Sequence, residues 1–233
     1  MPSVFLLRRC RPALQKSRAA VMRLAGWWVC GEGERVREAG EAIAALRPDI
    51  VACDLRLLDG HATRLAYEMR GWAGRRPQML LLSSSNEDLR LFDALSAGAD
   101  SYAADTGDGE GLADGLRRLA DRRAPMTASI AQQALAAFGV QRSRLAAAQL
   151  PTAGQDLGPT GAGLSMAEQH LLSLLAQGWL LPEIGERWLL QPAEIEQRLW
   201  RIYARLHARQ PLPAAQAAGG SVSMKLWRAA SFS

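Results

Sequence analysis

Short apolar runs alternate with amphipathic helical patterns along the first half of the chain, and this alternation restricts the possible folds most. Five apolar runs are expected to be buried strands, at 4–7, 27–30, 50–53, 79–82 and 102–104. Patterns with the 3.6-residue period of a helix follow them, at 12–24, 35–46, 62–72, 87–97 and 110–121. Strands that alternate with helices in this way predict a parallel sheet covered on both faces. We therefore expect residues 1–124 to form an α/β domain with a doubly wound, five-stranded parallel sheet, whose functional residues gather at the carboxyl ends of the strands.

The remaining length leaves room for a second domain, because 233 residues are enough for two ordinary domains with their connections. A hydrophobic content of 48% and a charged content of 22% are typical of a chain that folds around a core. An amphipathic pattern predicts a further helix at 125–139, and the Gly-, Pro- and Ala-rich stretch after it is typical of a tether. We therefore expect a helix and linker at 125–163, an all-α domain at 164–209 and a flexible tail at 210–233.

Composition also argues against several classes of protein. No apolar run reaches the roughly 18 residues of a membrane span, and the three cysteines (Cys10, Cys30 and Cys53) match neither a disulfide framework nor a zinc site. We expect small buried thiols in a cytoplasmic protein, with redox sensing by these cysteines as the alternative. The sequence contains no metal-ligand cluster, nucleophile–base pair or phosphate-binding loop, so we expect no cofactor, no metal and no enzymatic activity.

The basic residues are distributed unevenly along the chain. The net charge is +5, and the first 31 residues contain six Arg or Lys residues and no Asp or Glu. An acid-poor, Arg-rich start is compatible with a transit peptide. The same stretch also fits the first strand and helix of the α/β domain, which is the interpretation we favour.

The third part, residues 164–209, has the layout of a helix-turn-helix module. Ser165 is a typical N-cap ahead of an apolar helical run. A short helix is expected at 182–188, and Pro192 stands in the first turn of a longer helix that reaches about His207. Many regulators place the second helix of such a pair in the major groove of DNA.

This module resembles the effector domain of LuxR/NarL-type bacterial response regulators, without a gap. The matching stretches are 164–165, 174–178, 183–188, 194–195 and 202–206. The resemblance implies a transcription regulator whose effector domains pair as a homodimer, so that two recognition helices meet successive half-sites of DNA. The residues left to face DNA are Gln197, Arg198, Arg201 and Arg205, although these arginines would fit a solvated helix surface equally well.

Several residues of the module depart from the family pattern. Glu194 and Glu196 stand where the family brings a Thr and a Lys to the DNA, and a carboxylate repels phosphate. Leu189 replaces a turn Gly at a position that often needs a positive φ. The module contains five Arg and five Glu, so its net charge is 5 − 5 = 0, whereas DNA-binding domains are usually basic. We therefore expect weakened binding to DNA.

The α/β domain resembles the receiver domain of two-component systems, and the stretches 47–62 and 80–105 carry the resemblance. Asp54 lies where that family has its phosphate-accepting aspartate, at the end of the third strand. Ser83 lies at the Ser/Thr position after the fourth strand, and Tyr102 at the aromatic switch position on the fifth. The resemblance thus implies a phosphorylation pocket at one edge of the sheet.

The charges around this expected pocket are reversed. Arg8 and Arg9 replace the acidic pair that holds Mg²⁺ in the family, and Asp105 replaces its Lys. Phosphoryl transfer needs Mg²⁺ and fixed cations, and Mg²⁺ needs oxygen ligands. Two guanidinium groups beside Asp54 would repel the metal ion and pair with the carboxylate. We therefore expect a pseudo-receiver in which Asp54 is an ion-pair partner, with Ser83 and Tyr102 serving as packing residues.

Together these features predict an atypical response regulator that controls transcription without aspartyl phosphorylation. The alternative is an adaptor or antagonist that has lost DNA binding and acts through protein–protein contacts. The zero net charge of the helical module and the apolar pair Leu180-Leu181 favour the alternative. Trp200 lies on the recognition helix, where an exposed side chain would suit either a protein or a DNA contact.

Overall fold

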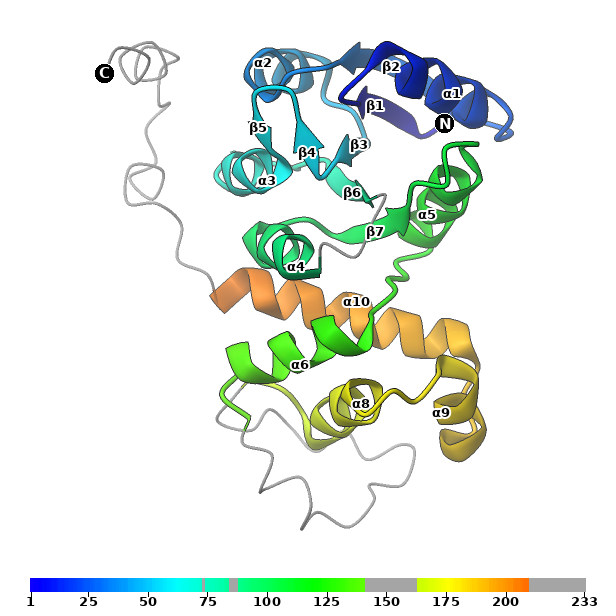
Figure 1. Cartoon of the computed structure of the whole chain (residues 1–233), viewed down its shortest axis with the longest axis vertical. Coiled ribbons are helices and arrows are strands. Elements are labelled where there is room, and N and C mark those ends of the chain that lie inside the picture. The colour runs from blue at the N-terminus through cyan, green and yellow to red at the C-terminus, as the bar shows by residue number, and fades with distance from the viewer. Residues whose placement is uncertain (73, 84–87, 141–162, 210–233) are drawn as a thin grey trace.

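A five-stranded parallel sheet forms the first part of the chain. The computed structural model describes residues 1–72, 74–83, 88–140 and 163–209. Its strands are β1 (Ser3–Leu7), β2 (Trp28–Gly33), β3 (Ile50–Asp54), β6 (Gln78–Ser83) and β7 (Ser101–Ala104). They are hydrogen-bonded in the order β2-β1-β3-β6-β7, and every pair is parallel (Figure 1). The predicted doubly wound sheet is therefore confirmed.

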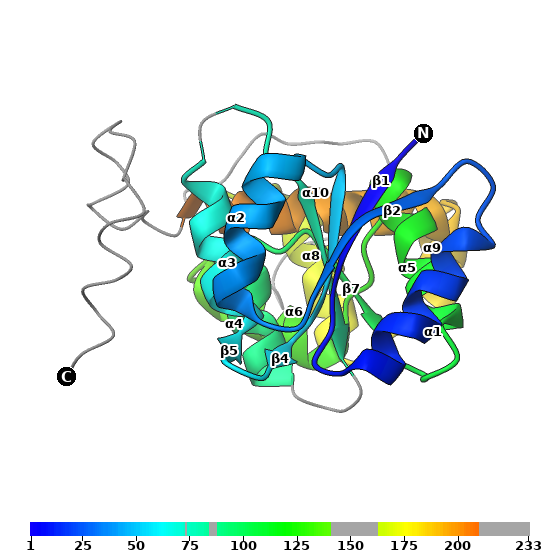
Figure 2. The same cartoon turned by 90° about the horizontal axis from the view of Figure 1, so that it is seen from above.

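Helices cover both faces of this sheet (Figure 2). One face carries α1 (Arg11–Met22) and α5 (Glu110–Ala120). The other face carries α2 (Val36–Leu46), α3 (Ala62–Arg70) and α4 (Asp88–Ala97). The three central strands, β1, β3 and β6, are almost completely buried, because apolar side chains meet helices on both sides.

A two-stranded antiparallel hairpin follows β3, and the sequence did not predict it. Its strands, β4 (Arg56–Leu57) and β5 (Gly60–His61), have two residues each, which is too short to show a strand period. The hairpin places Asp59 at the start of α2, where the carboxylate accepts the backbone N–H groups of Val36 and Arg37 at 2.8 and 3.1 Å. A residue distant in sequence thus caps α2, whose own N-cap residue supplies no side-chain acceptor.

The second part of the chain is helical. It contains α6 (Ala128–Ala137), α8 (Met166–Ala176), α9 (Leu181–Trp188) and α10 (Pro192–Arg209). The predicted cap of α8 is confirmed as a reciprocal capping box, because Ser165 Oγ accepts the Glu168 N–H at 3.2 Å and Glu168 Oε2 accepts the Ser165 N–H at 2.8 Å. The predicted tether and tail fall largely on 141–162 and 210–233, which lie outside the described residues.

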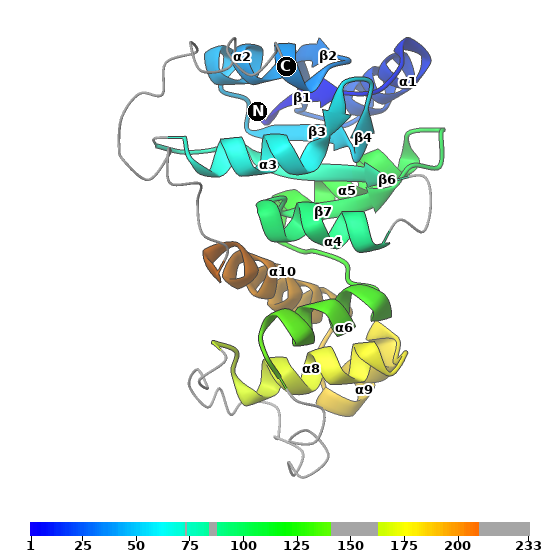
Figure 3. The ribbon, with the colours of Figure 1, turned by 60° about the vertical axis from the view of Figure 1, so that its left-hand side comes forward.

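One continuous apolar core joins the two parts. It runs from one face of the sheet through α4 and α6 into the helical domain, and includes Leu95, Ile130, Leu171 and Tyr203. Helices α10 and α6 both contact α4, the helix of the sheet-containing part that lies nearest to the helical part (Figures 1 and 3). The recognition helix predicted from the sequence is therefore packed against the receiver-like domain.

Candidate functional site

The carboxyl ends of β1, β3 and β7 meet at a pocket that one guanidinium group fills. Arg8 follows β1 and is 3% exposed. Its Nε donates to Asp54 Oδ1 at 2.8 Å, and its Nη2 donates to Asp105 Oδ2 at 2.6 Å. Its Nη1 donates to the hydroxyl of Ser17 on α1. The guanidinium thus bridges two carboxylates and has a separate acceptor for each of these three donors.

Asp54 has both carboxylate oxygens occupied. Oδ1 accepts from Arg8, and Oδ2 accepts the backbone N–H of Arg9 at 2.8 Å. The side chain of Arg9 is exposed, so this residue reaches the pocket only through its backbone. Burial raises the pKa of Asp54, while the Arg8 guanidinium and the Arg9 N–H act to lower it. The geometry is that of a carboxylate engaged as an ion-pair partner.

Ser83 and Tyr102 lie on neighbouring strands, and both are half-buried. The carbonyl oxygen of Ser83 accepts the Asp105 N–H at 2.8 Å, which ties the ends of β6 and β7 together. Burial raises the pKa of Tyr203 on α10 well above its ordinary value, and the nearby phenol of Tyr102 raises it further. The aromatic position of the receiver-like domain therefore lies close to the helical domain.

The three cysteines lie in different environments, and all are free thiols. Burial raises the pKa of Cys53 well above its ordinary value, and burial also raises the pKa of Cys30. A raised pKa keeps a thiol protonated and unreactive. The expectation of buried thiols is wrong for Cys10, because this residue is the exposed N-cap of α1. It borders a hollow of about 200 Å³ beside Arg8.

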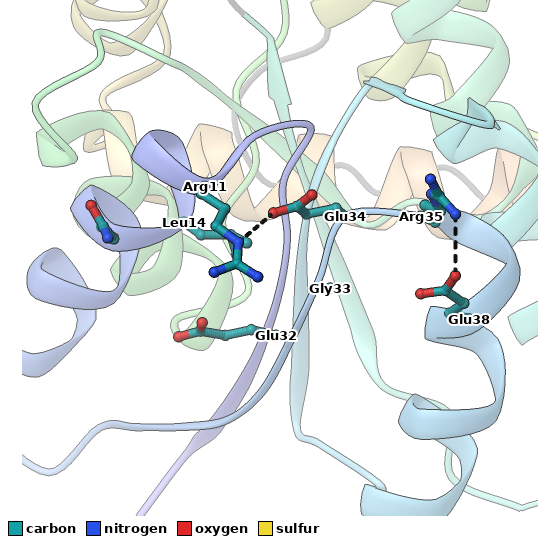
Figure 4. Close-up of a pocket in the computed structure, with 8 residues that line it drawn as sticks. Arg11, Leu14, Glu32, Gly33, Glu34, Arg35 and Glu38 are labelled. Carbon is teal, nitrogen blue, oxygen red and sulfur yellow. Dashed lines mark ion pairs between the residues drawn. The ribbon is translucent and has the colours of Figure 1, made fainter.

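A larger hollow of about 530 Å³ lies between the starts of α1 and α2, at the end of β2 (Figure 4). Four of its charged side chains pair with one another, Arg11 Nε with Glu34 Oε1 at 3.7 Å and Arg35 Nη1 with Glu38 Oε1 at 3.6 Å, and Glu32 pairs with Arg18 at 3.0 Å. No three His, Cys, Asp or Glu residues in the described part of the chain are grouped so that they could hold a metal ion. The hollow therefore gives no reason to assign a metal.

Helix α10 presents three stripes of side chains. One stripe is buried in the common apolar core and consists of Ile195, Leu199, Ile202 and Leu206. A second stripe faces the receiver-like domain and consists of Glu196, Trp200, Tyr203 and His207. The third is exposed and consists of Gln197, Arg201, Ala204 and Ala208.

Glu196 is held by two arginines of the receiver-like domain. Its side chain is 9% exposed; Oε1 lies 3.7 Å from Arg118 Nη1, and Oε2 lies 3.5 Å from Arg123 Nη1. Its carbonyl oxygen also accepts the Ala124 N–H at 3.2 Å. We call Glu196, Arg118 and Arg123 the arginine clamp. In this arrangement, Glu196 is covered by the receiver-like domain and cannot reach DNA.

Further contacts fix the rest of the stripe that faces the receiver-like domain. The Tyr203 hydroxyl donates to the Pro125 carbonyl oxygen at 2.8 Å, and His207 Nε2 lies 2.9 Å from the Ala99 carbonyl oxygen. Burial lowers the pKa of His207, and the two partners therefore meet with the imidazole in its neutral form. This stripe is held by contacts along its whole length.

The tryptophans of the helical domain divide between core and contact. Trp188 is 6% exposed and belongs to the core. Trp200 is half-buried, with the Arg122 guanidinium 5.8 Å from its ring centre. Trp200 therefore makes a contact within the chain.

The residues predicted to face DNA are placed differently from one another. Gln197 and Arg201 are exposed, and Arg198 is half-buried. Arg205 lies at the edge of the helix, where its Nη1 donates to Glu168 Oε2 at 2.6 Å. The structure thus leaves Gln197 and Arg201 open to solvent and binds Arg205 within the helical domain.

The turn before α10 has the backbone conformation expected from the family pattern. Leu189 has φ 54° and ψ 40°, so a left-handed position is confirmed, and its side chain is 91% exposed. Glu194 caps the start of α10, because its Oε2 accepts the Gln191 N–H at 2.8 Å. This carboxylate therefore stabilises the helix N-terminus.

Sequence reasoning missed the residues that join the domains. Arg118, Arg123 and His207 make polar contacts between the domains, yet the sequence shows the arginines only as charged positions in and after an amphipathic helix. No short-range pattern pairs them with α10.

Within the described residues, no helix is both long and apolar enough to cross a bilayer.

Similar proteins agree with this architecture. The "DNA-binding transcriptional activator DevR/DosR" of Mycobacterium tuberculosis is 29% identical over 180 residues, which are 76% of this chain and 76% of that protein. The "Response regulator protein VraR" of Staphylococcus aureus is 33% identical over 92 residues, which are 39% of this chain and 43% of that protein. No model of a known protein family matches the chain.

Solved structures show the same fold. A LuxR-family two-component response regulator from Aurantimonas sp. SI85-9A1 has a TM-score of 0.50 and 26% identity, and covers 60% of this chain and 98% of its own. The RcsB response regulator of Salmonella typhimurium has a TM-score of 0.50 and 16% identity over 91% of this chain and 95% of its own, which supports the fold alone. The chain is therefore a homologue of the two-component response regulators of the LuxR/NarL type, with a receiver-like domain followed by a helix-turn-helix domain.

Proposed function

We propose that the chain is a DNA-binding transcription regulator whose receiver-like domain works without aspartyl phosphorylation. The observation that carries the proposal is the position of Arg8, which fills the pocket between Asp54 and Asp105. The DNA-binding part of the proposal is supported by the helix-turn-helix formed by α9 and α10, and by the likeness to a relative named as a DNA-binding transcriptional activator.

The chemistry of the pocket disfavours phosphoryl transfer. Mg²⁺ binds oxygen ligands, whereas the group between the two aspartates is a guanidinium. Both oxygens of Asp54 are already engaged, and Asp105 adds a negative charge where a phosphoryl group would need a cation. We infer that this domain keeps a fixed arrangement of charges, in which the ion pairs of Arg8 with Asp54 and Asp105 stand in for both the metal ion and the phosphoryl group.

The exposed stripe of α10 supports a role in DNA binding. Gln197 and Arg201 stand one turn apart on a helix that would enter the major groove, where Arg contacts phosphate or guanine and Gln contacts adenine. Arg198 flanks them, and Arg205 contributes after its ion pair with Glu168 rearranges. Two such helices in a homodimer would meet successive half-sites. We expect this regulator to act in the cytoplasm.

The rival function is an adaptor that acts through protein contacts. Leu180 and Leu189 flank α9 and are 63% and 91% exposed, and exposed apolar side chains favour a protein partner. The two functions differ in what the chain does with DNA. Only the regulator is expected to bind a duplex with an affinity that depends on the exposed arginine of α10.

A salt titration tests the proposed function. The full chain should bind a labelled random-sequence duplex at low salt, and binding should weaken steeply as salt rises, because phosphate contacts release counterions. Arg201→Ala should reduce the salt slope by about one unit. Arg64→Ala, which removes a half-exposed arginine of α3, is the matched control and should change the slope little. Absence of binding at the lowest salt would overturn DNA binding and favour the adaptor.

A further inference from the structure

Glu194 lies in the first turn of α10, and its side chain is exposed. Residues three, four and seven positions apart on a helix share one face. Glu194 therefore shares a face with Gln197, Arg198 and Arg201, the side chains that the proposed function turns toward DNA. Because a recognition helix contacts base edges chiefly with its N-terminal residues, Glu194 is well placed to meet a base.

One oxygen of the Glu194 carboxylate is held, and the other is open. Oε2 accepts the Gln191 N–H at 2.8 Å, whereas Oε1 has no partner among the described residues. The partial positive charge of the helix N-terminus stabilises a negative side chain at this position. The carboxylate is thus fixed at the start of the helix and keeps one free acceptor for a donor on DNA.

The four bases differ in what they offer such an acceptor in the major groove. Guanine and thymine present acceptors only, and adenine presents its N6 amino group beside the acceptor N7. Cytosine presents the N4 amino donor without a neighbouring acceptor. Resting on the proposed function, we propose that Glu194 is a specificity-determining residue that accepts a hydrogen bond from the N4 amino group of cytosine.

This assignment gives the carboxylate two opposite effects on DNA binding. It weakens the contact with every duplex, because it repels phosphate. It also discriminates between bases at one position, because guanine or thymine there would bring an acceptor against a desolvated carboxylate. Replacing the cytosine should weaken binding about five- to a hundredfold, the usual range for one direct base contact.

Selection from a randomised duplex library by the full chain tests the assignment. The unmodified chain should select cytosine at one position of each half-site. Glu194→Gln keeps an oxygen for the Gln191 N–H and presents an amide, which pairs with N6 and N7 of adenine. This variant should change the selected base at that position from cytosine to adenine and leave the other positions as they are.

A titration with the selected duplex gives a second measure. Exchanging the cytosine–guanine pair for thymine–adenine should weaken binding of the unmodified chain by the factor given above. The same exchange should change the affinity of Glu194→Ala little, because the side chain that tells the bases apart is absent.

Glu183 provides a matched control, because it has the equivalent place in the first turn of α9. Its side chain is exposed, and its Oε2 accepts the Leu180 N–H at 2.7 Å. Glu183→Gln makes the same chemical change and removes the same charge. It should leave every selected base unchanged.

The outcomes separate the readout of cytosine from the proposed function. Selection of the same bases by Glu194→Gln and the unmodified chain, or of no cytosine by the unmodified chain, would overturn the readout and leave DNA binding standing. A change spread over several positions would also overturn it, because Glu194 would then only orient α10. Absence of binding to any duplex at the lowest salt would overturn both. A switch to adenine confined to one position supports both.

Discussion

In the receiver-like pocket and in the arginine clamp, one side chain has the charge opposite to that of the corresponding position in the family pattern, Arg8 in the pocket and Glu196 in the clamp. The two sites hold this side chain with different strength. In the pocket, the Arg8 and Asp54 side chains are 4% and 9% exposed and meet at 2.8 Å. In the clamp, Glu196 is equally buried, but its two arginines are about one-third exposed and lie 3.5 to 3.7 Å away. The pocket is thus closed by short, buried pairs, and the clamp by longer, partly solvated ones.

This difference shows how burial decides the role of a reversed charge. Removing one partner of a buried pair leaves an uncompensated charge, so the pocket can hardly rearrange while the domain stays folded. A partly exposed pair contributes little and can exchange its partner for water. We therefore assign the pocket a permanent structural role and the clamp an adjustable one. The continuous apolar core around Tyr203 joins the two parts, and the clamp adds longer, partly solvated ion pairs beside it.

Removing the pocket arginine should have the largest effect on stability. Arg8→Ala leaves Asp54 and Asp105 without their shared cation and should lower the free energy of unfolding by about 3–5 kcal/mol. Asp54→Ala should cost less, because Arg8 keeps its pair with Asp105. Thermal or urea unfolding followed by circular dichroism measures both.

The neighbouring residue is the control for this prediction. Arg9 has an exposed side chain and supplies only its backbone N–H, so Arg9→Ala should change stability by less than about 0.5 kcal/mol. If Arg8→Ala and Arg9→Ala were equally mild, the guanidinium of Arg8 would be solvated and the pocket open. The contrast drawn here between the two sites would then fail.

Lowering the pH should weaken the docking of α10 against the receiver-like domain through His207, with a smaller effect than removal of the pocket arginine. The ordinary pKa of histidine is about 6.5, and burial lowers the pKa of docked His207. Among the neighbouring groups, Asp100 and the Ala99 carbonyl act to raise this pKa, and Arg76 and Arg70 act to lower it. The docked state therefore favours the neutral ring. As pH falls below about 6.5, undocked His207 gains its proton first, and docking weakens until the lowered pKa is passed.

Hydrogen exchange of α10 between pH 7.5 and 5.5, corrected for its intrinsic pH dependence, measures this effect. Exchange should rise as pH falls, by a factor of up to about ten for each unit by which the pKa is lowered. His207→Gln keeps an N–H donor for the Ala99 carbonyl and should remove the dependence. His61 and His170 complete the three histidines of the chain. Persistence of the dependence in His207→Gln, with its loss in a variant of either other histidine, would refute this assignment.

The sequence was sufficient where a local pattern determines structure. Alternating apolar runs predicted the parallel sheet, and the cap at Ser165 and the left-handed turn at Leu189 were both expected from their positions. The reversed charges around Asp54 predicted an ion pair in place of a metal site. Adjacent residues at a strand end point in opposite directions, so only one of Arg8 and Arg9 could place its side chain in the pocket. The sequence did not show which of the two it would be.

The sequence was insufficient where contacts join distant segments. Glu196 and Arg118 lie 78 positions apart, and no helical or strand period relates them. The sequence suggested that Glu196 would oppose DNA directly, whereas the structure pairs it with the receiver-like domain. The cap that Asp59 makes at the start of α2 was missed for the same reason, because the N–H groups that donate to its carboxylate lie more than 20 residues earlier.

The most direct test of the central claim is whether the pocket takes up a phosphoryl group. The full chain is incubated with acetyl phosphate and Mg²⁺, and its intact mass is measured beside that of Asp54→Asn. Because the Arg8 guanidinium pairs with both Asp54 and Asp105, and Mg²⁺ needs such oxygen ligands, we expect no change in mass for either protein. A stable gain of one phosphoryl group in the unmodified chain, absent from Asp54→Asn, would contradict the account.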